Sequence, residues 1–323
     1  MRLLNSGAGG LRRLWSGLKS AAFCKEGGVR ALWKLVFAYG LYILWAWAAT
    51  YLLSLGFGAL FAAWNVNAAT VARAPGWAQG LFANYGRLIS MISSAGAIAL
   101  SWALARLLAG RRFERLRARD FALGALWGLL SVLAGAGLFL AVDSMRPYVR
   151  ELSFHTDLLW MLAVYYLAAL AEERFARGLT MRVATLHAHP AWGYAASALM
   201  FLAVTGAYAL RPLGIVNMLL TALICARLSA MGKAGAAVGL RFAWSWASSA
   251  FIAFPGAATG AQAALRLYAV SENWLTGGDG GLICGAWMTL VLLALAAWLL
   301  RKPMRTLWQQ MAARRESAKT KKH

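Results

Sequence analysis

The chain has 323 residues, of which 61% are hydrophobic and 14% charged, and its mean hydropathy is +0.58. This composition is too apolar for a soluble domain of that length and predicts an all-α, polytopic integral membrane protein. The net charge is +22, and the basic residues that produce it are concentrated in the intervals between apolar runs rather than along one face of the protein. We therefore do not predict nucleic acid as a partner.

The first 34 residues form a basic segment that precedes the first long apolar run. Seven of them are Lys or Arg, and Leu11, Leu14 and Leu18 recur at helical spacing. This pattern fits either an amphipathic helix on the membrane surface or a plain tail. No secretory signal peptide is apparent, and Cys24, Cys225 and Cys284 lack metal or redox spacing.

Eight apolar runs follow, which we interpret as about eight transmembrane helices in a domain of residues 35–300. They cover 35–64, 88–105, 121–142, 158–171, 191–210, 213–226, 234–254 and 282–300. We expect a polar loop at 65–87, a Gly-rich loop at 255–281 and a basic tail at 301–323. Gly124 and Gly128, and likewise Gly235 and Gly239, are spaced for close helix packing.

The distribution of Lys and Arg predicts how these helices are oriented. Alternate intervals, namely 1–34, 106–120, 172–189, 227–233 and 301–323, hold 26 of these residues, against six in the opposite loops. By the positive-inside rule, the 26 lie in the cytoplasm together with both termini. We therefore expect a multi-pass protein of the cell membrane whose basic segments meet anionic lipid headgroups.

Two adjacent carboxylates, Glu172 and Glu173, follow the fourth run and precede Arg177 and Gly178. Carboxylates near hydrocarbon are costly, so such a pair suggests a functional site. Hydrolysis of an amide would require a base for water and donors for the developing oxyanion. A charged helix end at the membrane boundary is the plain alternative.

Three short motifs resemble those of the CPBP family of intramembrane proteases, also called the CAAX protease and bacteriocin-processing or Abi family. Glu172-Glu173-x-x-x-Arg177-Gly178 stands intact, whereas Thr205 replaces a histidine four residues after Phe201. In the third motif, Arg241 and Ser245 stand where the family has His and Asn. The Gly-rich stretch 275–281 also fits, so the likeness covers about residues 120–300.

The resemblance implies an endopeptidase that cleaves prenylated or membrane-delivered peptides. In the family, a glutamate of the first motif and the histidine of the second are thought to activate water, while the third motif stabilises the oxyanion. Thr205 cannot carry a proton as His does, and Arg241 stays cationic. The sequence names no cofactor, and the residues that remain do not support a divalent metal.

Arg241, a cation within the seventh run, requires a partner or a route to the surface. The resemblance implies that this position packs near Glu172 and Glu173. We therefore expect a buried ion pair with one of them, which would weaken that carboxylate as a base, unless Arg241 snorkels to the surface. Glu173 and Arg177 are spaced to pair along one helix face. Arg241 could also serve as an oxyanion donor, and His187 or His189 could replace the lost histidines.

Three functions remain open from the sequence. The chain is a divergent CPBP protease, or a non-catalytic relative that binds a membrane partner, for example in bacteriocin immunity or regulation, or a small transporter. The intact first motif favours the protease lineage over a transporter. The substitutions at Thr205, Arg241 and Ser245 favour the non-catalytic relative over present-day activity.

Overall fold

A computed structural model describes residues 31–110, 113–148, 154, 156–186, 190–206, 211–255, 263–270 and 274–299. The basic N-terminal segment up to Arg30, the tail from Arg301, and His187 and His189 lie outside these residues. Predictions made for them are therefore not addressed by the structure.

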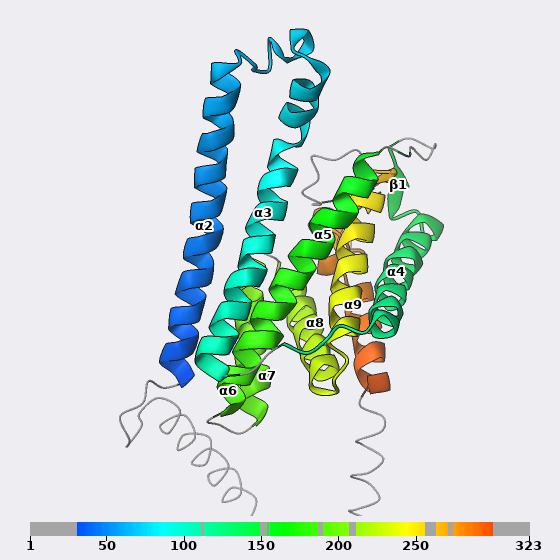
Figure 1. The fold of residues 1–323 in the computed structure, drawn as a ribbon. Helices are drawn as coiled ribbons and strands as arrows, with labels where there is room; N and C mark the ends of the chain where they lie inside the picture. Colours follow the sequence, from blue (N-terminus) through cyan, green and yellow to red (C-terminus); the bar gives the residue numbers. More distant parts are fainter. Residues whose placement is uncertain are drawn as a thin grey trace, which may run out of the picture.

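The described residues are mostly helical, and a helix occupies each of the eight apolar runs (Figure 1). The α-helices are α2 (Ala31–Ala63), α3 (Gly76–Ala109), α4 (Ala118–Ala141), α5 (Asp157–Glu173), α6 (Arg182–Leu186), α7 (Pro190–Val204), α8 (Pro212–Ala230), α9 (Ala234–Trp246) and the helix Ala286–Leu299. Of these, α2, α3, α4 and α8 are long and apolar enough to cross a membrane, with mean hydropathies between 1.6 and 2.0.

A small sheet accompanies the helices at one end of the bundle (Figure 1). β3 (Leu265–Ala269) pairs antiparallel with β1 (Met145–Pro147) and parallel with β2 (Ile252–Ala253). Short 3-10 helices span Val71–Arg73, Gly278–Gly280 and Leu282–Cys284. The expected Gly-rich loop thus contains ordered strand and 3-10 structure, because its backbone can pair with segments that lie far away in the chain.

Two other intervals predicted as loops are in part helical. α3 begins at Gly76, directly after Pro75, so Arg87 lies within a helix, where it forms a 2.7 Å ion pair with Asp157 of α5. The interval 172–189 is likewise helical as far as it is described, up to Leu186. α5 continues through a π-helical segment, η2 (Arg174–Met181), into α6.

α2 and α3 form a long hairpin that extends beyond the other helices (Figure 1). They contain 33 and 34 residues, so each is about 50 Å long, compared with about 30 Å for the hydrocarbon core of a bilayer. Apolar side chains on α2 are widely exposed, for example Trp47 at 64% and Leu52 at 64%. A helix of this kind fits a membrane by tilting or by reaching past it.

α4 and α9 pack backbone to backbone through four glycines. A methyl group added at Gly124 or Gly239 would overlap the carbonyl oxygens of Ala236 and Phe121, respectively. One added at Gly128 would lie 2.6 Å from the Leu240 carbonyl oxygen. The close packing predicted from both glycine pairs is therefore confirmed. It places α9, and with it Arg241, against the centre of the bundle.

Candidate functional site at the Glu172–Glu173 motif

The two glutamates end α5 at the point where the helix changes to π geometry. The π-helical segment begins at Arg174 and holds Arg177 and Gly178, so the whole first motif lies on one continuous helical element. π-Helical turns are rare and often occur at functional sites. We call this end of the bundle, where α3 ends and α4 starts, the arginine-rich end.

Each glutamate of the motif forms an ion pair with an arginine. Arg177 Nη1 lies 2.8 Å from Glu173 Oε1, and these side chains are 2% and 4% exposed. Arg241 Nη2 donates to Glu172 Oε2 at 2.9 Å, with exposures of 7% and 19%. The predicted pairing of Arg241 with one of the glutamates is confirmed, with Glu172 as the partner. The alternative, in which Arg241 snorkels to the surface, is wrong.

Phe201, the aromatic residue of the second motif, lies between the two arginines. Its ring centre is 4.2 Å from the Arg177 guanidinium carbon and 5.0 Å from that of Arg241. A buried guanidinium gains electrostatic stabilisation from an aromatic face. Arg177 Nη2 also donates to the Ala222 carbonyl oxygen of α8 at 3.0 Å. The cluster therefore joins α5, α7, α8 and α9.

Thr205 and Ser245 have no such central role. The Thr205 hydroxyl donates to the carbonyl oxygen of Phe201 in its own helix at 2.8 Å, and Ser245 lies half-buried one turn beyond Arg241 in α9. Among the described residues, no hydrogen bond joins either hydroxyl to Glu172 or Glu173. Arg241 Nε and Nη1 are also buried without a hydrogen-bond partner in the described part of the chain.

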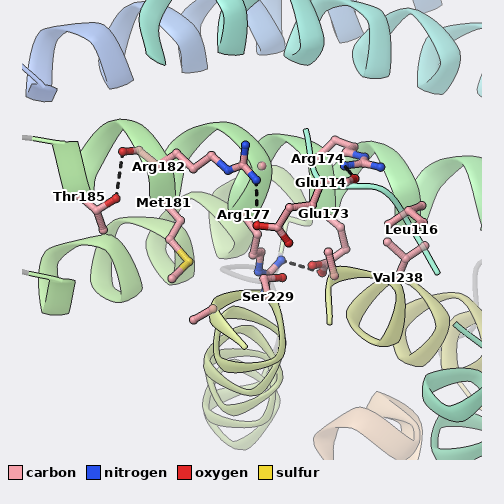
Figure 2. Close-up of a pocket in the computed structure, with 13 residues that line it drawn as sticks. Glu114, Leu116, Glu173, Arg174, Arg177, Met181, Arg182, Thr185, Ser229 and Val238 are labelled. Atoms are coloured by element: carbon pink, nitrogen blue, oxygen red, sulfur yellow. Dashed lines mark hydrogen bonds and ion pairs between the residues drawn. The ribbon is translucent and has the colours of Figure 1, made fainter. Parts of the chain in front are cut away.

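A pocket of about 450 Å³ at the arginine-rich end is lined in part by the Glu173–Arg177 pair (Figure 2). The linker before α4 closes one side of it. Arg182 Nη2 contacts Glu114 Oε1 at 3.1 Å, and Arg174 Nη1 donates to the Glu114 carbonyl oxygen at 3.0 Å. The remaining wall comes from the end of α8 and the start of α9, including Ser229 and Val238.

The rim of this pocket is electropositive. Burial and, secondly, the neighbouring Arg182 cation lower the pKa of the Arg174 guanidinium below its usual range. The Arg174 guanidinium also lies over the Phe113 ring at 4.9 Å, and this ring fills the space beside Gly178. Three arginines and two glutamates line the pocket, so it favours an acidic group over a basic one.

The chemistry available in this cluster is limited. Proton transfer at an amide needs a group that accepts and then returns a proton near neutral pH. Glu172 and Glu173 are each engaged by an arginine, and arginine remains protonated. In the described ranges, no three His, Cys, Asp or Glu side chains gather as ligands for a metal ion. The arrangement can hold an acidic group, and the described residues of the cluster include no histidine.

Sequence reasoning missed the residues contributed by the linker before α4. In the interval 106–120, for which we predicted only a position near lipid headgroups, Phe113 packs against Gly178 of η2 and Glu114 lines the pocket. The available signal was Glu114 itself, an acidic residue among six cations in that interval.

Comparisons with protein-family models, with curated proteins and with solved structures find no match to this chain.

Proposed function

We propose that this protein is a non-catalytic relative of the CPBP intramembrane proteases that binds a membrane-delivered peptide through an acidic group. The observation that carries the proposal is the ion pair between Glu172 and Arg241. Arg241 stands where the resemblance places a histidine, and its charge holds the carboxylate that would otherwise act as the base. The described residues of the site therefore retain binding groups and include no histidine that could carry a proton.

The pocket above the cluster supports the choice of ligand. It opens beside Arg174 and Arg182 and has the Glu173–Arg177 pair at its floor. An acidic side chain or a terminal carboxylate that enters it would meet two rim cations, of which it would share Arg182 with Glu114. Charge-assisted hydrogen bonds to arginine are strong. A cytoplasmic segment of a membrane-associated protein has both the access and the chemistry to do so.

The proposal includes a topology. The chain crosses the cell membrane eight times, both termini are cytoplasmic, and the arginine-rich end faces the cytoplasm. The asymmetry of 26 to six in Lys and Arg supports this orientation. A helix in each of the eight apolar runs supports the number of crossings. The basic segments would then face anionic lipid headgroups.

A cleavage assay separates this proposal from a divergent active protease. Purified protein is incubated with a panel of fluorogenic membrane peptides, and wild type is compared with Glu172→Ala. We expect no turnover above background in either protein. Turnover that wild type shows and Glu172→Ala loses would overturn the non-catalytic assignment and establish the protease.

A binding assay tests the ligand class in the same preparation. We expect Arg182→Gln to weaken binding of a lipidated peptide with an acidic terminus by about tenfold, the loss of one charge-assisted contact. Arg115→Gln removes an exposed cation from the linker, outside the pocket, and serves as the matched control. Equal affinities of wild type and Arg182→Gln would contradict an acidic-group site.

A further inference from the structure

A lateral groove lies on a different face of α8 and α9 from the pocket above Glu173. It consists of two adjoining cavities of about 310 Å³ and 610 Å³, bounded by α4, α8, α9 and the helix Ala286–Leu299. Both cavities are lined by the same four apolar residues, Trp127, Leu240, Leu295 and Trp298. The two cavities therefore adjoin along these four side chains, and we call them together the groove.

The walls of the groove are apolar and open onto the outer surface of the bundle. Leu123 and Leu130, which line it on α4, are 46% and 49% exposed, and the Trp127 and Trp298 rings meet at 5.7 Å between α4 and the last helix. Along α4 the apolar part of the lining runs from Leu123 to Ala134, a rise of about 16 Å, and Asp120 extends the lining by about one further turn. This length matches the depth of one leaflet, about 15 Å, or half the hydrocarbon core.

Charge is concentrated at one end of the groove. Arg227 at the end of α8 and Lys233 just before α9 line the wider cavity, where Asp120 is the acidic residue. Arg227 Nε is buried without a hydrogen-bond partner among the described residues. At the other end, the charge of Arg241 is already balanced by Glu172. Among the described residues that line the groove, the excess positive charge thus lies at its Arg227–Lys233 end.

We propose that this groove binds one molecule of an anionic glycerophospholipid. Arg227 and Lys233 hold its phosphate, and an acyl chain lies along Trp127, Leu240, Leu295 and Trp298. An anionic headgroup joined to a long apolar chain matches a groove that is cationic at one end and apolar along one leaflet depth. A peptide would place polar backbone groups against walls that cannot satisfy them.

Native mass spectrometry of the full chain, with phosphatidylglycerol and phosphatidylcholine of identical acyl chains, tests the headgroup part of the site. We expect wild type to retain phosphatidylglycerol at least about tenfold more than phosphatidylcholine, a difference of about 1.4 kcal/mol. The double variant Arg227→Gln, Lys233→Gln should lose this preference. The control Arg115→Gln, Arg119→Gln has the same net charge and should keep it, since both residues are exposed and outside the groove.

Two further experiments test whether the groove binds an acyl chain. Phosphatidylglycerol with a photoreactive diazirine in mid-chain should crosslink to α4 and the helix Ala286–Leu299. Crosslinks confined to α2 and α3 would overturn the proposal. Inorganic phosphate should not raise the melting temperature as phosphatidylglycerol does, and equal stabilisation by both would mean that the groove takes no acyl chain. Loss of preference in both double variants would also overturn it.

Discussion

Arg241 is held between the carboxylate of Glu172 and the ring of Phe201, at 2.9 Å and 5.0 Å respectively. A single positive charge inside a bundle is costly, and the ion pair offsets this cost only while both partners are present. We therefore expect Glu172→Gln to lower the free energy of unfolding by about 3 to 5 kcal/mol. The melting temperature in detergent measures this loss.

Two controls show whether the effect comes from the buried pair. Glu114→Gln breaks an ion pair whose glutamate is 46% exposed and should cost only about 0 to 1 kcal/mol. The double variant Glu172→Leu, Arg241→Met removes both charges and should recover most of the loss. An unchanged melting temperature for Glu172→Gln would show that the pair does not contribute to stability.

At the scale of elements, the contact of α4 with α9 depends on glycines that leave no room for a side chain. Gly124 faces the Ala236 carbonyl, so Gly124→Ala forces the helices apart. We expect a loss of about 1 to 3 kcal/mol, the usual cost of overpacking. α9 also carries Val238, which lines the pocket at the Glu173–Arg177 pair, so the variant should also weaken peptide binding. Thermal unfolding and the binding assay measure the two effects.

Gly137 provides the control within the same helix. It is exposed in α4, and a methyl group added there meets nothing within 4 Å. Gly137→Ala should leave stability unchanged or raise it by about 0.5 to 1 kcal/mol through helix propensity. Equal effects of Gly124→Ala and Gly137→Ala would contradict a tight backbone contact between α4 and α9.

At the scale of the whole molecule, the proposed topology places the tip of the α2–α3 hairpin and the α8–α9 turn on opposite sides of the membrane. Ala68 and Met231 are exposed at these two places. In a chain with its three cysteines replaced by alanine, Ala68→Cys should react with an impermeant maleimide in intact cells. Met231→Cys should react only after permeabilisation. The reverse pattern, or reaction of both in intact cells, would refute the orientation.

The sequence by itself determined the helical class, the places of the apolar helices and the close glycine contacts, because each of these depends on local composition or spacing. Eight apolar runs each contain a helix, and the Gly124 and Gly239 contacts are as predicted. It also predicted that Arg241 needs an anionic or polar partner or a route to the surface, because a lone buried charge is costly. The choice of Glu172 or Glu173 as that partner came from the family resemblance.

Only the tertiary structure decided which carboxylate Arg241 meets and what covers the motif. Glu172 and Glu173 are neighbours in sequence, but Glu172 pairs with Arg241 on α9, 69 residues away, whereas Glu173 pairs with Arg177, four residues along its own helical element. Phe113 and Glu114 reach η2 because α3 and α5 pack side by side at the arginine-rich end. The groove likewise exists only where α4 meets the helix Ala286–Leu299. Such juxtapositions depend on long-range packing, which local spacing does not encode.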